Sequence, residues 1–135
     1  MSYILDTNIV TAILKQDRQV AKQLRLVEAR RQALFISCIT YYEIQRGLLY
    51  VNSTRKLSLF NEFCRDATVV FLDDIQIIEK ASEIHADLKR RGRPIQDADI
   101  LIAATAIVRS LILVSNDSDM LRVSDLALEN WLQME

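Results

Sequence analysis

Short runs in which every residue is apolar alternate along this chain with longer segments whose apolar residues recur at helical spacing. The first run, residues 3–5, is followed by a segment whose apolar residues are Ile9, Val10, Ile13 and Leu14. The same change of period recurs at residues 34–37 before 39–51 and at 69–72 before 75–89, and in reverse order where 100–108 precedes 111–114. Each change predicts a strand joined to a helix.

The predicted strands are apolar on every residue instead of alternating, which is typical of a parallel sheet covered by helices on both faces. The helix after Asp74 has one apolar side, formed by Ile77, Ala81, Ile84 and Leu88. These patterns predict the α/β class and a three-layer α/β/α sandwich. The segment Gly92-Arg93-Pro94 predicts the break between the last two helices.

The length of 135 residues is that of one domain with one core, so we expect residues 1–135 to form a single domain. Hydrophobic residues make up 50% of the chain and charged residues 26%, which is a globular balance. We find no linker, repeat or low-complexity segment. The sequence gives no reason to expect a second domain.

Cys38 and Cys64 stand alone, and His85 is the single histidine, so neither a zinc site nor a disulfide framework is expected. No basic segment precedes the first strand, which argues against a signal peptide. The longest apolar run is broken by Arg109 and Ser110 and is shorter than the ~20 residues that span a bilayer. We therefore expect a cytoplasmic protein that does not enter a membrane.

The formal net charge of −1 argues against nucleic-acid binding through a globally positive surface. Basic residues are nevertheless clustered in two segments: Lys89, Arg90, Arg91 and Arg93, and Lys15, Arg18, Lys22, Arg25, Arg30 and Arg31. Two interpretations stay open for these clusters: solvated helix faces, or patches that contact phosphates.

Four acids are placed where a parallel sheet binds ligands. Asp6 directly follows the first strand, and Asp117 comes two residues after the last, Leu111 to Ser115. Because ligands bind beyond the carboxyl ends of parallel strands, these two side chains are expected to converge. Glu43 lies on the helix after the second strand, with Ser37 as its expected N-cap, and Asp99 opens the helix that continues through residue 100.

Each acid alone has a structural explanation: Asp6 and Asp99 as helix caps, and Asp117 as a turn residue. Glu43 is harder to explain, because it lies between Tyr42 and Ile44 on a largely apolar helix, with Gly47 leaving space one turn later. A buried, unpaired carboxylate is costly. A shared cation would account for all four acids at once.

Oxygen ligands without histidine or thiolate favour Mg²⁺ or Mn²⁺ over zinc. Such an ion can activate a water and neutralise phosphate charge, and a second ion can assist the leaving group. Support residues are expected at both strand ends: Thr7, Asn8, Ser115 and Asn116. Turn and cap roles are the alternative for these four. Asp97 is a candidate cap, Asp119 a candidate ligand of a second ion, and His85 a surface residue.

The sequence resembles the PIN-domain ribonucleases, and in particular the VapC toxins of bacterial toxin–antitoxin pairs. Five stretches carry the resemblance, in the family's order: residues 4–8, 36–43 with Gly47, 99–104, 113–119 and 128–131. By matching position, the resemblance assigns the metal-site acids to Asp6, Glu43, Asp99 and Asp117, with Asp119 as a frequent fifth. It implies a five-stranded parallel sheet, Mg²⁺- or Mn²⁺-dependent cleavage of RNA, a homodimer, and inhibition by a cognate antitoxin.

Two positions depart from the family pattern. Met120 stands where an aromatic is frequent, and Asp97 adds an acid beside Asp99. Two other functions are alternatives to RNA cleavage. A phosphatase with Asp6 as nucleophile would want a further Asp at the position of Asn8, and a non-catalytic interaction domain would be expected to lose some of the acids.

Overall fold

The middle layer of the fold is a five-stranded sheet in which every strand pair is parallel. The computed structural model describes residues 1–133. The strands are β1 (Tyr3–Leu5), β2 (Leu34–Ser37), β3 (Thr68–Val70), β4 (Ile112–Val114) and β5 (Leu128–Glu129), in the order β3-β2-β1-β4-β5. The predicted parallel sheet is therefore confirmed, and the order reverses between β1 and β4.

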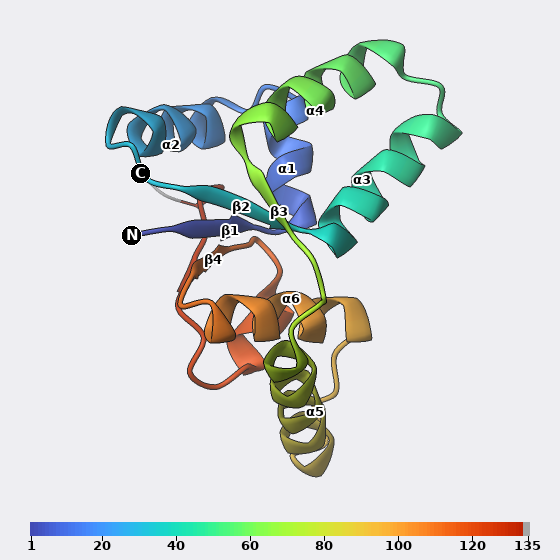
Figure 1. Cartoon of the computed structure of the whole chain (residues 1–135), viewed down its shortest axis with the longest axis vertical. Helices are drawn as coiled ribbons and strands as arrows, with labels where there is room; N and C mark the ends of the chain where they lie inside the picture. Colours follow the sequence, from blue (N-terminus) through green and yellow to red (C-terminus); the bar gives the residue numbers. More distant parts are fainter. Residues whose placement is uncertain (134–135) are drawn as a thin grey trace.

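Helices cover both faces of this sheet (Figure 1). On one face lie α1 (Thr7–Leu14), α2 (Arg18–Ala29), α3 (Cys38–Tyr50) and α4 (Thr54–Asp66), and on the other α5 (Ile75–Arg90) and α6 (Asp97–Val108). A short 3-10 helix, η1 (Ser118–Arg122), follows β4. The three-layer α/β/α architecture is as predicted.

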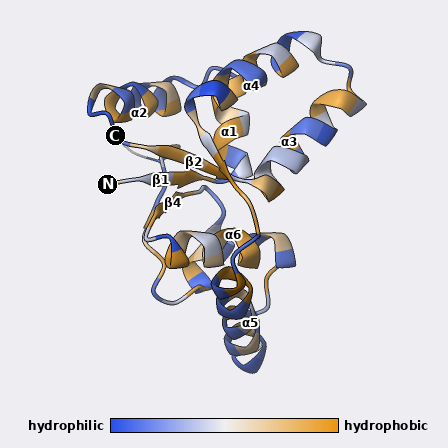
Figure 2. Cartoon of the chain, in the orientation of Figure 1, coloured by the Kyte–Doolittle hydropathy of each residue, from blue (hydrophilic) through white to orange (hydrophobic). Residues whose placement is uncertain are grey.

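Alternation along the strands sends successive side chains into two separate cores. In β1, Tyr3 and Leu5 belong to the core under α1–α4, whereas Ile4 belongs to the core under α5 and α6. In β4, Val114 and Leu113 divide in the same way. Because β1, β2 and β4 are covered on both sides, nearly all of their residues are apolar, as the hydropathy colouring of Figure 2 shows.

Helix starts in this chain are set by short polar side chains, since the sequence has only two glycines and one proline. The side chains of five residues accept a hydrogen bond from the first turn of the following helix: Asp6, Asp17, Ser37, Ser53 and Asp74. Such caps satisfy backbone donors that have no partner in the helix. Ser37 thus has its predicted role, and Gly92, at φ 67°, closes α5 in the left-handed conformation that favours glycine.

The apolar pattern did not predict α4, and it left α2 as one of the two open interpretations of the basic segment 15–31. In α4, Leu57, Phe60, Phe63 and Cys64 share a face that packs into the core, and Phe60 is fully buried. The spacing of these residues is helical, but no strand directly precedes the segment to mark it. Among residues 1–133, no helix is long and apolar enough to cross a membrane.

Candidate metal centre

Asp6 is the deeply buried acid of the site, with only 3% of its surface exposed. Asp6 directly follows β1, the strand that pairs with β4. It caps α1, because its Oδ1 accepts a hydrogen bond from Thr7 N at 2.8 Å. Its other oxygen, Oδ2, accepts from Ser115 Oγ at 2.7 Å. Burial raises the pKa of the Asp6 carboxyl, although these two hydrogen bonds oppose the shift.

The segment after β4 is tied to the segment after β1 by a small polar network. Ser115 Oγ donates to Asp6 and accepts from Asp117 N at 3.0 Å. The Asn8 amide contacts Asp6 Oδ2 at 3.3 Å, and its Oδ1 accepts from Asn116 N at 2.9 Å. Three of the four predicted support residues, Thr7, Asn8 and Ser115, therefore contact site acids directly. The Asn116 side chain instead accepts from Asn130 Nδ2 at 2.8 Å.

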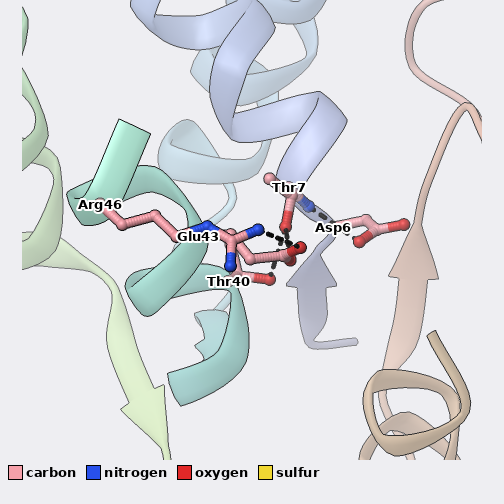
Figure 3. Close-up of polar contacts among 5 residues, drawn as sticks. All are labelled: Asp6, Thr7, Thr40, Glu43 and Arg46. Carbon is pink, nitrogen blue, oxygen red and sulfur yellow. Dashed lines mark hydrogen bonds and ion pairs between the residues drawn. The ribbon is translucent and has the colours of Figure 1, made fainter. Parts of the chain in front are cut away.

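Glu43 reaches the site from α3 and is neither fully buried nor unpaired, which corrects the expectation for this residue. Its side chain is 28% exposed, and its Oε1 accepts from Thr7 Oγ1 at 2.8 Å. Figure 3 shows Thr7 between Glu43 and Asp6, with buried Thr40 below it at 3.3 Å from the Thr7 hydroxyl. The Glu43 side chain points from α3 toward the carboxyl ends of the strands and remains partly exposed to solvent. Space beside Gly47 is open, as expected.

Asp99 lies in the first turn of α6 and faces Asp117 and Asp119. One carboxylate oxygen from each of these three acids lies within 4.8 Å of the other two. Burial raises the pKa of Asp99 to about 6, and the negative charges of Asp6, Asp117, Glu43 and Asp119 add to the shift. The fold thus gathers all four predicted acids, and Asp119, into one pocket at the carboxyl edge of the sheet.

The donor set of this pocket fits a hard divalent cation. Every candidate ligand is a carboxylate oxygen, and no histidine or thiolate stands among them. Burial is the main cause of the raised pKa values of Asp6 and Asp99, and the negative charges of neighbouring carboxylates add to both shifts. Asp99, Asp117 and Asp119 could each offer an oxygen to one ion. Arg122 forms an ion pair with Asp119, with Nη2 3.2 Å from Oδ1, and would compete with a metal ion for this carboxylate.

Three further sequence predictions concern residues outside this pocket. Asp97 was a candidate cap, which is wrong: it is the first residue of α6, and Gln96 occupies the cap position without a side-chain hydrogen bond. His85 is exposed on α5, as predicted. The cluster Lys89, Arg90, Arg91 and Arg93 lies at the end of α5 that points away from the sheet (Figure 1).

Sequence reasoning missed two residues that complete the network. Thr40 supports Thr7, and Asn130 holds Asn116 while accepting from Leu132 N at 3.0 Å. Both lie inside stretches that carry the family resemblance, which was the available signal. Neither residue type by itself distinguishes a support role from an ordinary helix or turn position.

Comparisons with known proteins agree with this architecture. A model of the PIN domain matches residues 3–126. Ribonuclease VapC2 of Rickettsia felis is 33% identical over 140 residues, covering 97% of this chain and 98% of that protein. Ribonuclease VapC1 of Haemophilus influenzae strain R2866 is 29% identical over 136 residues, covering 97% and 98%.

Solved structures give the same result. VapBC2 from Rickettsia felis, bound to a DNA fragment from its promoter, superposes with a TM-score of 0.86 at 28% identity, covering 97% of this chain and 99% of that one. DNA-bound VapBC from Salmonella typhimurium gives 0.85 at 26% identity, covering 97% and 98%. The chain therefore belongs to the PIN-domain family and, within that family, groups with the VapC proteins.

Proposed function

We propose that this protein is a metal-dependent endoribonuclease and the toxin of a toxin–antitoxin pair. The observation that carries the proposal is the convergence of Asp6, Glu43, Asp99 and Asp117 on one pocket, where the pKa values of Asp6 and Asp99 are raised. The similarity to ribonucleases of the VapC group over nearly the whole chain supports RNA as the substrate. We place its action in the cytoplasm, where that substrate is found.

The acids would hold Mg²⁺ or Mn²⁺: Asp99, Asp117 and Asp119 could each offer an oxygen to one ion, and Asp6 and Glu43 are proposed as further ligands. The bound ion would supply an activated water and charge neutralisation at the phosphate. Ser115 Oγ fixes the orientation of Asp6, and Thr7 Oγ1 fixes that of Glu43. These hydroxyls hold both carboxylates in place before substrate arrives, which reduces reorganisation during the reaction.

Both alternative functions have less support. A phosphatase that used Asp6 as nucleophile would need an accessible carboxylate, whereas Asp6 is 3% exposed and has Asn8 two residues on, hydrogen-bonded to it. A non-catalytic interaction domain would not need the acids, yet all of them remain gathered in the pocket. RNA hydrolysis is the function that uses every one of them.

Two protein partners belong to the proposal. The cognate antitoxin is supported by the likeness to VapBC complexes. A second copy of this chain is supported by exposed apolar side chains after β3 and at the start of α5, namely Phe71, Ile75 and Ile78. Exposed apolar groups of this size are typical of association surfaces.

The proposal is tested by incubating purified protein with labelled structured RNAs in Mg²⁺ or Mn²⁺, with and without chelator. We expect cleavage that chelator abolishes. Asp6→Asn should reduce the rate at least ~100-fold, because a ligand and its charge are lost. The control Asp97→Asn removes an exposed acid from α6 and should cleave like the wild type. Cleavage at the wild-type rate by Asp6→Asn, or cleavage that persists in chelator, would contradict the proposal.

A further inference from the structure

Arg46 projects from α3 beside Glu43, one of the site acids (Figure 3). Its Nη2 lies 4.0 Å from Glu43 Oε2, and its guanidinium carbon lies 4.9 Å from the centre of the Tyr42 ring. The side chain is 58% exposed. One oxygen of Glu43 therefore faces Thr7 and the site, and the other faces a cation in solvent.

The contact with Glu43 leaves the guanidinium free to bind something else. Charge-assisted hydrogen bonds are about 2.7–2.9 Å long, so a separation of 4.0 Å is a weak ion pair rather than a bond. Five N–H donors in a planar fork match the oxygens of a phosphate. Stacking on Tyr42 holds the fork in position, which lowers the entropy lost when an anion binds.

Two further cations continue this side of the site. A groove between α1, α3 and α4 is lined by Lys15 and Lys56, by Thr7, Thr11, Glu43 and Gly47, and by the apolar residues Leu14, Ile44 and Leu48. Positive charge next to a pocket of carboxylates is the arrangement that a polyanion needs if its backbone is to approach those acids. By contrast, Arg91 in the predicted basic cluster is bonded to Asp87 at 2.7 Å and to the Arg122 carbonyl at 2.6 Å.

We propose that Arg46 binds an RNA phosphate that flanks the cleaved bond. This inference rests on the proposed function and identifies α3, rather than the end of α5, as the helix that holds the RNA backbone. A competing role for Arg46 would be to neutralise Glu43 only. The two roles differ in measurable ways, because a phosphate contact affects RNA binding and its salt dependence even when the metal is removed.

The experiment compares Arg46→Gln, Arg46→Lys and the control Arg109→Gln with the wild type. Arg109 is exposed and follows α6 at the opposite end of that helix from Asp99, so its loss removes the same charge away from the site. Binding of labelled oligouridine is followed by fluorescence anisotropy in chelator over a range of salt. Steady-state kinetics are measured with divalent cation on an RNA that the wild type cleaves.

We expect Arg46→Gln to weaken oligouridine binding and raise KM about tenfold, with kcat changed less than about twofold. The slope of log affinity against log salt should fall in magnitude by about 0.7, the value for one phosphate contact on a single strand. Arg46→Lys should recover part of the affinity and the full slope, and Arg109→Gln should match the wild type.

Unchanged oligouridine binding by Arg46→Gln, or a loss confined to kcat, would overturn the inference and assign Arg46 to Glu43 alone. Failure of the proposed function is separate from this outcome. It would show as a wild-type protein that cleaves no RNA in any divalent cation, whereas binding by the variants decides the role of Arg46.

Discussion

The pKa of the Asp99 carboxyl lies well above the ordinary value of 3.8 for an Asp side chain. Burial is the main cause of its raised pKa, about 6, and four neighbouring carboxylates act in the same direction. In the metal-free protein, Asp99 therefore keeps its proton into the range where an ordinary Asp has lost it. Any cation that binds must displace that proton, so affinity for the ion should weaken as pH falls through about 6.

Asp99→Asn should stabilise the metal-free protein at neutral pH. Because the folded pKa lies above the ordinary value of 3.8, the contribution of Asp99 to stability is present below that value and is lost as pH rises through about 6. The variant carries no charge, so its Tm should exceed that of the wild type above this window, by roughly 2–6 °C, and match it below. Thermal unfolding in chelator across this range measures the gap.

Asp97→Asn is the matched control for that series, because Asp97 is exposed and lies two positions away in the same helix. Its Tm should follow the wild type at every pH. If the difference in Tm between Asp99→Asn and the wild type stayed constant with pH, Asp99 would not change its protonation state in this pH range.

At the level of residues, the sequence located the acids but not their environments. Asp6 and Asp117 could be placed because strand ends in a parallel sheet share an edge. Glu43 was expected to be buried, and this failed because the direction of a helix face depends on packing against α1, which the local pattern does not contain. Asn130 was missed because its partner, Asn116, is brought to it by the pairing of β4 and β5.

At the level of elements, the site depends on how the ends of β1 and β4 are joined. Ser115 makes this link: it follows β4, is 3% exposed, and donates to Asp6 after β1 at 2.7 Å. The hydrogen bond lowers the pKa of Asp6 against the effect of burial. A single hydroxyl therefore both positions a carboxylate and keeps it available as a ligand.

Ser115→Ala should weaken Mn²⁺ binding roughly 10- to 100-fold, the usual effect of losing a group that orients a ligand. Asp6 Oδ2 would lose its 2.7 Å donor and keep only Asn8 Nδ2 at 3.3 Å, so the pKa of Asp6 would rise further. Isothermal titration with Mn²⁺ measures the affinity. Thr105→Val is the control, because it removes a buried hydroxyl that donates to Leu101 O within α6 and keeps the side-chain volume. Equal affinities for Ser115→Ala and wild type would contradict this role for Ser115.

Helices and strands could be predicted where their burial requires a regular pattern of apolar residues. Strands β1, β2 and β4, buried on both faces, gave continuous apolar runs, and α5 gave a one-sided stripe. The bounds of these elements, and those of α3 and α6, were found within a few residues. The start of α6 was the exception. Gln96 caps it without a side-chain bond, so the usual signal of a capping Asp was absent and Asp97 was taken for it. The helix α4 lacked a preceding strand to mark its place.

At the level of the whole molecule, the acids meet only because the chain order reverses between β1 and β4. Asp6 and Asp117 come from the two strands at this reversal, while Glu43 arrives over one face of the sheet and Asp99 over the other. The three layers must therefore all be formed before the pocket exists. Partner choice is the part that the sequence leaves open, because neither RNA target nor antitoxin is specified by a pattern within the chain.

The most direct test of the shared cation is a titration of the metal-free protein with Mn²⁺ while Tm is followed. A ligand that binds only the folded state stabilises it, by about 2.7 kcal/mol at one hundred times Kd. We predict that the Tm of the wild type rises with Mn²⁺, that Asp117→Asn shows a much smaller rise, and that Asp125→Asn, an exposed acid in a loop after η1, behaves like the wild type. A wild-type Tm that does not respond to Mn²⁺, or an equal response from Asp117→Asn, would contradict the account.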